Sequence, residues 1–253
     1  MARVSDGESL RAVRAAATAT ARAAARVVVP VECPVCGQPD ERLCPGCRAV
    51  LDGPLRRRDG GAPAIDGAWP VWALGPYEGG LRAVVLAWKT AGRADLGSEL
   101  REAMVAAGAA WARAGPASLE APVWVVPAPS SRARRRRGRP PVADLADGLA
   151  EGIAHAGRAT RVVEVLRRTG GGQAGRGARA RGSAARAGTR LAALPPPGTA
   201  CVLVDDVLTT GATLAASRDV LCSGGARVLG AVVLAAASSA GGASRGLPPA
   251  SVR

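Results

Sequence analysis

CVLVDDVLTTGATL, residues 201–214, is the stretch that decides the fold of this chain of 253 residues. Residues 200–204 are short, apolar and partly β-branched, which predicts a strand, and residues 212–222 carry leucines on one helical face. Two glycines then end the helix, and the apolar run 227–235 predicts a second strand. Parallel strands need a helical crossover, so the loop between this strand and this helix lies at the carboxyl end of the strand.

That loop combines two acids, three hydroxyls and a glycine. A helix N-terminus offers unpaired backbone N–H groups and the positive end of a dipole, both of which favour a phosphate. Carboxylates just before it can accept hydrogen bonds from ribose hydroxyls and help to hold Mg²⁺ with its waters. An ordinary Asp-rich turn does not explain this combination. The pattern predicts a sugar-phosphate site formed by Asp205, Asp206, Thr209, Thr210, Gly211, Ala212 and Thr213.

Four cysteines near the N-terminus form two C-x-x-C pairs in CPVCGQPDERLCPGCRAVL, residues 33–51. Four thiolates can close one tetrahedral zinc shell, and the metal replaces the core that so small a segment cannot build. Two disulfides of a secreted protein are the alternative. However, Arg22 and Arg26 interrupt the N-terminal apolar stretch that a signal peptide needs. We therefore predict a cytoplasmic protein with a structural Zn²⁺ site, whose ligands are Cys33, Cys36, Cys44 and Cys47. Cys201 and Cys222 are expected to be packed, reduced thiols.

The run VLVDDVLTTGATL resembles the phosphoribosyl diphosphate (PRPP) signature of type I phosphoribosyltransferases, as written in the ComF family of competence-related proteins. Members of that family pair an N-terminal zinc module with a phosphoribosyltransferase-like domain, in the order found here. The resemblance implies a parallel-sheet α/β core of the type I phosphoribosyltransferase kind, preceded by a small zinc-binding module. It also implies PRPP and Mg²⁺ as ligands, a catalytic role for Asp205 and Asp206, and transfer of phosphoribosyl to an amine or nucleobase.

The loop VVPAPSSRARRRRGRPP, residues 125–141, stands where the family has a V-P-V-P loop that approaches the diphosphate. An Arg-Gly pair is kept, but Arg-Pro-Pro replaces the family's Phe-Asn-Gln. By resemblance the substrate contacts in this loop are Ser130, Ser131, Arg132 and Arg137. The basic block 134–137 is either a solvated entrance to a helix or a contact for diphosphate or a nucleic-acid backbone.

A second family-like segment is LRRTGGGQAGRGARARGSA, residues 166–184, which keeps Arg168, Gln173 and Arg181 but has Ala184 at the family's Asn position. The resemblance implies a loop that closes over PRPP and excludes water. The alternative is an Arg/Gly linker without catalytic duty.

The net charge of +14 would ordinarily indicate a nucleic-acid partner. However, the chain has 33 Gly, 19 Pro and no Phe, and its cations are arginines except for Lys89, so compositional bias explains part of the charge. Lys89, in AWKTAG, resembles the family's Leu-Lys-Tyr-x-Gly segment. It either places an ammonium near the diphosphate or extends to water from a helix end. The lone His155 is given no role.

We expect five parts along the chain: an N-terminal helix (1–30), the zinc module (31–52), a linker (53–67), the phosphoribosyltransferase-like domain (68–240) and a disordered tail (241–253). Within the domain, alternating strands and helices are typical of a parallel α/β fold. They include a strand at 160–166 and a stretch without regular structure at 167–190. No apolar run approaches the ~20 residues that span a bilayer.

The resemblance also implies a function of another class. ComF proteins are associated with uptake of single-stranded DNA, so the chain could hold such DNA or a DNA-uptake protein, with the PRPP site regulatory or residual. A sensor that binds PRPP without turnover is a third interpretation.

Overall fold

The computed structural model describes residues 31–58, 62–65, 67, 69–115, 122–130, 140–168, 188–237 and 245–246. The chain divides into two compact units, with the boundary between Arg48 and Ala49. The helix predicted at 1–30 lies outside the described residues, as do the loop segments 131–139 and 169–187.

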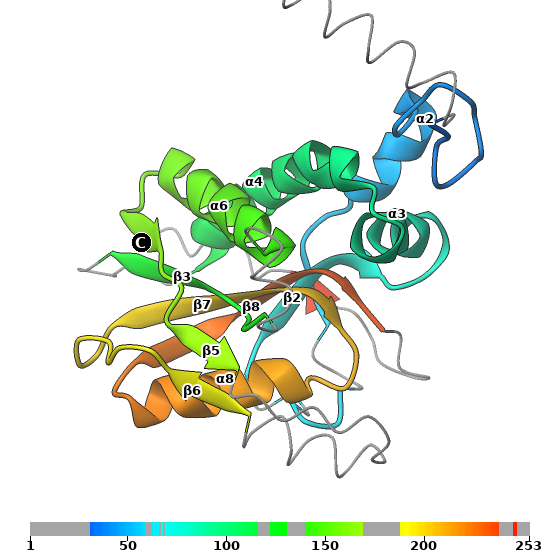
Figure 1. The fold of residues 1–253 in the computed structure, drawn as a ribbon. Coiled ribbons are helices and arrows are strands. Elements are labelled where there is room, and N and C mark those ends of the chain that lie inside the picture. Colours follow the sequence, from blue (N-terminus) through cyan, green and yellow to red (C-terminus); the bar gives the residue numbers. More distant parts are fainter. Residues whose placement is uncertain are drawn as a thin grey trace, which may run out of the picture. The chain divides into compact units, whose positions relative to one another are not determined.

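A seven-stranded sheet forms the centre of the second unit (Figure 1), in the order β4-β3-β7-β8-β2-β1-β9. The five strands from β4 to β2 are parallel, and β1 is antiparallel to both of its neighbours. The strands are β1 (Arg56–Arg57), β2 (Val71–Pro76), β3 (Val123–Pro127), β4 (Thr160–Val162), β7 (Ala200–Leu208), β8 (Arg227–Ala236) and β9 (Arg245–Gly246). The predicted α/β fold with a mainly parallel sheet is confirmed.

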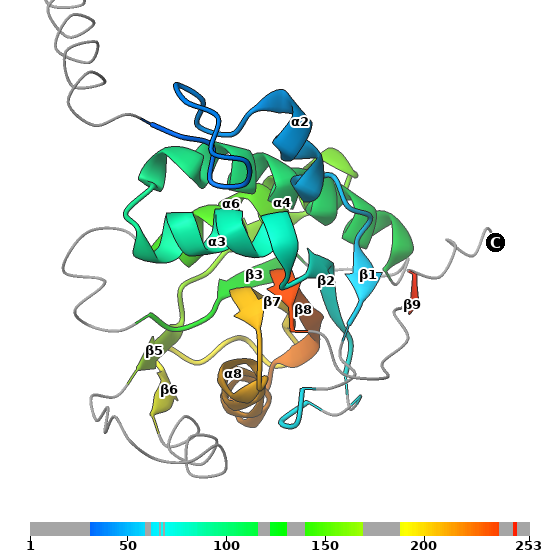
Figure 2. The same ribbon diagram turned by 90° about the vertical axis from the view of Figure 1, so that its right-hand side faces the viewer.

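Helices cover both faces of this sheet (Figures 1 and 2). One face carries α3 (Gly79–Thr90), α4 (Gly97–Ala114) and α6 (Pro141–His155), and the other carries α8 (Ala212–Ser223). Two short 3-10 helices, η1 (Ala49–Leu51) and η2 (Ala94–Leu96), precede β1 and α4. Inner strands covered on both sides are mainly apolar, and every residue of β3 is buried. In the part of the chain described, no helix has the length and hydropathy to cross a membrane.

The contact between α4 and α6 depends on glycines. A Cβ atom on Gly108 of α4 would overlap the backbone of Leu149, and one on Gly152 of α6 would overlap the backbone of Val105. Only glycine permits so close an approach of two helix backbones. This packing fixes the position of α6, whose first turn lies at the carboxyl end of β3.

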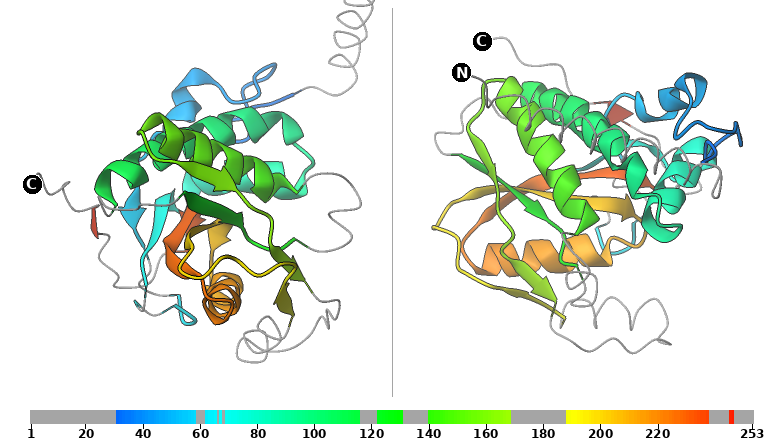
Figure 3. Two further views of the ribbon diagram at one scale, coloured as in Figure 1. Left: turned by 90° about the vertical axis from the view of Figure 1, so that its left-hand side faces the viewer. Right: turned by 45° about the horizontal axis from the view of Figure 1, so that its top comes forward.

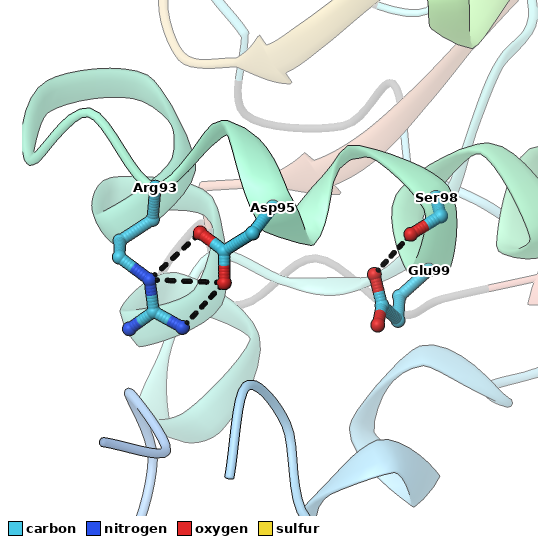
Figure 4. A network of polar contacts seen from close by, with 4 residues as sticks. All are labelled: Arg93, Asp95, Ser98 and Glu99. Carbon is cyan, nitrogen blue, oxygen red and sulfur yellow. Dashed lines mark hydrogen bonds and ion pairs between the residues drawn. The ribbon is translucent and has the colours of Figure 1, made fainter. Parts of the chain in front are cut away.

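Side chains brace the turn that follows α3 (Figure 4). Arg93 donates from Nε and Nη2 to the two carboxylate oxygens of Asp95, each at 2.8 Å, and Ser98 donates to Glu99 at 2.7 Å. The backbone N–H of Arg93 also bonds to the carbonyl of Ala87 in α3. The bond to Ala87 ties this turn to the last turn of α3, which carries the only lysine of the chain.

Residues 53–67, expected to be a linker, take part in the second unit. β1 pairs with β2, and the side chains of Leu55, Ala62 and Ile65 are buried. The expected tail, 241–253, contains β9, which pairs with β1. Composition alone misses these contacts because glycine and proline mark a break in regular structure without indicating what packs against it.

The segment predicted as a single strand at 160–166 forms parts of two strands. β4 ends at Val162, and β5 (Leu166–Arg168) pairs antiparallel with β6 (Thr189–Leu191) in a separate ribbon next to α8 (Figure 3). β6 begins within 167–190, for which we predicted no regular structure. Leu191 packs against the hydrophobic core, a long-range contact that no local pattern indicates.

Candidate functional site

A cleft lies at the carboxyl ends of β3 and β7. From β3 the chain crosses through α6 to β4 on one side, and from β7 it crosses through α8 to β8 on the other. Such a reversal of direction opens a crevice in which open α/β sheets bind ligands. The cleft has a volume of ≈ 320 Å³. The predicted site residues that line it are Lys89, Ser130, Asp205, Asp206, Thr209 and Thr213. The remaining lining residues are Tyr77, Ala128, Pro129, Val142, Arg168 and Val207.

The two acids lie within β7 rather than after it, because β7 continues to Leu208. The ladder between β3 and β7 ends at the pair Pro127–Val204, so both acids extend past the end of β3. The Asp206 N–H donates to Oδ1 of Asp205 at 2.9 Å, and the Val207 N–H donates to Oδ1 of Asp206 at 2.8 Å. These bonds hold the two carboxylates in place along the cleft.

Lys89 reaches the cleft from the last turn of α3 and pairs with Asp206. The distance from Nζ to Oδ2 is 2.7 Å, and the side chains are 33% and 8% exposed. With its other oxygen bonded to the backbone of Val207, Asp206 has a partner on each carboxylate oxygen. A nearly buried carboxylate is stable only when it is satisfied in this way.

Gly211 shapes the loop between β7 and α8. It stands at the N-cap of α8 with a φ of +75°, and its carbonyl accepts the N–H of Ala215. A Cβ atom here would lie 2.6 Å from Cγ1 of Ile65, so both conformation and space require glycine. Thr209 and Thr210 remain exposed, so the loop is open to solvent.

The threonines of this loop have different roles. Thr209 and Thr213 line the cleft, while Thr210 bonds to the loop itself. Oγ1 of Thr210 accepts the Ala212 N–H at 3.4 Å, and its carbonyl accepts the Ala64 N–H at 3.0 Å. The loop therefore offers two hydroxyls to the cleft and uses the third for its own structure.

Ile65 supports the loop from behind, which the sequence interpretation missed. Its side chain is 2% exposed and lies in one hydrophobic cluster with Leu214 of α8 and Leu208 at the end of β7. The run Ala-Pro-Ala-Ile between glycines gave no signal of this role. Tyr77 was also missed, although its place directly after β2, at the carboxyl edge of a parallel sheet, could have indicated it.

The loop after β3 is described only in part. Ala128 donates its N–H to the carbonyl of Val204 at 2.7 Å, and Ser130, 9% exposed, faces the cleft. Arg168, at the end of β5, lines the same cleft. The other residues carried over from the family resemblance lie outside the described residues: Ser131, Arg132, Arg137, Gln173, Arg181 and Ala184.

The first unit is described from residue 31 to Arg48 and contains α2 (Pro45–Arg48). It brings the sulfur atoms of Cys33, Cys36, Cys44 and Cys47 within 4.8 Å of one another. The Cys36 and Cys44 sulfurs are 3.7 Å apart. Four sulfurs at zinc-binding distance form a tetrahedron with edges of about 3.8 Å, whereas a disulfide bond is about 2.05 Å long. All six cysteines of the chain are free thiols, and this cluster fits a zinc ion.

The backbone of this unit favours the thiolate of Cys33. Burial opposes ionisation of Cys33, but N–H donors from Cys36, Cys44 and Val35 outweigh it and lower its pKa to about 6. The neighbouring Cys44 sulfur, together with desolvation, raises the pKa of Cys47 to about 12. Crowded sulfurs cannot all ionise unless a cation joins them, and a bound dication would remove this obstacle.

The other two cysteines differ from each other. Cys201 is fully buried in the core, and desolvation, with a smaller effect of Cys222, raises its pKa to about 12. Cys222 is exposed on α8, which corrects the prediction that it is packed. The prediction was wrong because Cys222 lies at the end of α8, where the spacing of apolar residues along the helix no longer determines which side chains are buried.

Residues 135–248 match the family model of the phosphoribosyl transferase domain. The matched segment includes β7, the threonine loop and α8, while β2 and β3 precede it. A search of curated proteins found no match to the chain. Residues 135–248 are thus similar to a phosphoribosyl transferase domain, and a four-cysteine cluster precedes them in the sequence.

Proposed function

We propose that this protein binds PRPP with Mg²⁺ and transfers the phosphoribosyl group to an amine or nucleobase acceptor, as a ComF-type member of the phosphoribosyltransferases. The observation that carries the proposal is the cleft at the end of β7. Two carboxylates and the N-terminus of α8, which begins at Ala212, meet in one cavity. The match of residues 135–248 supports the same reaction class.

The 5-phosphate belongs at the N-terminus of α8 in this proposal. Thr209 and Thr213 supply hydroxyl donors, and the helix dipole favours the dianion. Asp205 and Asp206 then face the ribose, whose hydroxyls can donate to their oxygens. Mg²⁺, when bound, would neutralise charge on the diphosphate and hold it through oxygen ligands.

The reaction exchanges one bond at the anomeric carbon. The bond to the diphosphate oxygen breaks, and the diphosphate leaves with the electron pair. A bond from the acceptor nitrogen forms, and its proton is released to solvent or a base. The protein contributes mainly by positioning the two partners and stabilising charge. Arg168 is placed to meet anionic groups at the rim of the cleft.

The test begins with binding. PRPP with Mg²⁺ should raise the unfolding temperature of the protein by mass action, and release of diphosphate should then be followed with a panel of amines and nucleobases. The double change Asp205→Asn plus Asp206→Asn should remove most of the stabilisation. Asp219→Asn, on the exposed side of α8, is the matched control and should leave it unchanged.

Three results would count against this function. PRPP stabilisation that the double change fails to weaken would place the ligand elsewhere. An absence of PRPP binding would remove the substrate altogether. Binding without diphosphate release for any acceptor would favour a PRPP sensor over an enzyme.

Binding of single-stranded DNA is a second candidate, favoured by the β5–β6 ribbon. Arg167 and Arg190 are directly opposed across its strands, next to Arg168 at the cleft. Like charges in this position destabilise a sheet, and a phosphate backbone would relieve the repulsion.

Salt dependence tests the DNA function. Arg167→Gln plus Arg190→Gln should make the slope of log affinity for an oligonucleotide against log salt concentration less steep. The change should correspond to the loss of about two phosphate contacts. Arg113→Gln, in the last turn of α4, serves as the charge control. Strong binding that survives Asp205→Asn plus Asp206→Asn would favour DNA, while binding insensitive to salt would exclude this mode.

The cysteine cluster and the location of the protein complete the proposal. We assign the four thiols a structural zinc ion with no open coordination position. The six cysteines, all within the described residues, form no disulfide bond, which fits a reducing compartment such as the cytoplasm.

A further inference from the structure

We infer that Lys89 competes with a divalent cation for Asp206, so that the cleft rejects the free cation and accepts it together with an anionic ligand. This inference deepens the proposed function and rests on it for the identity of the anion. It concerns the order in which charges enter the cleft.

The geometry places the ammonium where a cation would act. Nζ of Lys89 lies 2.7 Å from Oδ2 of Asp206, while Oδ1 is held by the Val207 N–H at 2.8 Å. The carboxylate thus has one oxygen fixed by the backbone and one held by a group that can leave. The Asp206 side chain is 8% exposed, so a second cation has little room to share the oxygen.

Charge explains why a free cation is disfavoured. A divalent ion that approaches Asp206 meets the positive charge of Lys89, and it must either displace the ammonium or bind beside it. Both cost free energy, since like charges at short distance repel strongly where water is partly excluded. Removal of Lys89 should therefore strengthen binding of the bare ion.

An anionic ligand reverses this balance. A diphosphate or phosphate in the cleft offers the ammonium a new partner, and Lys89 comes from a helix end with its side chain one-third exposed, so it has room to turn. Asp206 is then released for ribose hydroxyls or for water bound to the cation. Cation and anion thereby favour each other's binding, and linkage makes this coupling reciprocal.

The turn after α3 makes Lys89 suited to this exchange. The Arg93–Asp95 pair and the Arg93 N–H bond to Ala87 hold the backbone beyond the lysine. The helix end stays in place while the flexible side chain moves between two anions. The exchange requires only rotation about side-chain bonds.

The experiment measures binding of Mn²⁺, a paramagnetic substitute for Mg²⁺, by water-proton relaxation. Without PRPP, Lys89→Met should bind Mn²⁺ at least about fivefold more tightly than the natural protein, the lower end of usual coupling between sites. Lys89→Arg keeps the charge, and Arg113→Met removes a distant charge; both should stay within about twofold of the natural protein. With PRPP present, the natural protein should gain more Mn²⁺ affinity than Lys89→Met does.

A double variant tests whether Asp206 is the contested group. Lys89→Met plus Asp206→Asn should lose the gain in Mn²⁺ affinity. Unchanged or weaker Mn²⁺ binding by folded Lys89→Met would overturn the inference, as would no measurable binding by any variant or a gain that persists in the double variant. Circular dichroism establishes folding, and if Lys89→Met fails to fold, Lys89→Gln replaces it in the same comparison.

The two proposals fail in different ways. If PRPP does not bind the natural protein, the proposed function falls, but the comparison of Mn²⁺ binding without PRPP still decides the competition between Lys89 and the cation.

Discussion

Gly211 combines two requirements at one position. Its positive φ starts α8 at the right point, and its missing side chain leaves room for Ile65. The acids and threonines supply the chemistry of the loop, but they are useful only if this turn keeps its shape.

Gly211→Ala should lower the free energy of unfolding by about 1–3 kcal/mol and weaken stabilisation by PRPP. The added Cβ atom would sit in a positive-φ conformation and lie 2.6 Å from Cγ1 of Ile65. Urea unfolding measures the stability change. Gly97→Ala is the control and should be neutral or stabilising, because Gly97 has helical backbone angles and a Cβ atom there would make only an ordinary contact, 3.8 Å from Nε1 of Trp88. Equal unfolding midpoints for the Gly211 variant and the natural protein would contradict this account.

Cys201 and Cys222 should differ sharply in reactivity. Cys201 is buried with its pKa raised to about 12, so little thiolate exists at pH 8, whereas Cys222 is exposed. Iodoacetamide should label Cys222 in the zinc-loaded native protein and reach Cys201 only after unfolding. Peptide mass spectrometry gives the site, and Cys222→Ser should abolish native labelling outside the cysteine cluster. Native labelling of Cys201 would show that its strand opens readily.

At the scale of elements, the sequence pattern predicted those strands and helices that depend on nearby residues. The strand, helix and strand from 200 to 235 follow from apolar runs and terminating glycines. β1, β9 and β6 are only two or three residues long, and they exist because of partners far away in sequence. The site shows the same division. Asp205 and Thr213 belong to one sequence motif, whereas only the tertiary fold brings Tyr77 to the cleft and Ile65 to the back of the threonine loop.

Ile65→Ala tests the support that the segment before β2 gives to the threonine loop. The loss of buried volume should cost about 2–4 kcal/mol of stability and should also weaken PRPP binding, since Gly211 and Leu214 lose their packing partner. Ile153→Ala, equally buried in the last turn of α6, should cost similar stability without changing affinity. Unfolding curves and calorimetric titration separate the two effects. Equal PRPP affinities for the two variants would remove the positioning role.

At the scale of the whole molecule, the four-cysteine unit and the sheet unit are separate compact bodies. The order of the two units was predictable from motif order. Strand order was not, because it depends on which apolar runs pair, and the neighbouring positions of β3 and β7 create the cleft. The net charge was the least informative property, since it reflects arginine content along the whole chain.

Cys44→Ser should abolish tight binding of zinc, because three thiolates and a hydroxyl hold this ion poorly. The main unfolding transition, which reports the sheet unit, should remain cooperative. Native mass spectrometry measures the zinc content and scanning calorimetry the transition. Cys222→Ser should retain one zinc ion. Full zinc occupancy in the Cys44 variant would show that the four sulfurs do not act together.

The single side-chain amine of this protein is the one in its cleft. Any acylation of a lysine on this chain would therefore neutralise the partner of Asp206 and add bulk at the ligand site. In most proteins, acylation is distributed over many surface lysines. Here it has a single lysine as its target, and the extent of acylation would report directly on how often that amine is exposed.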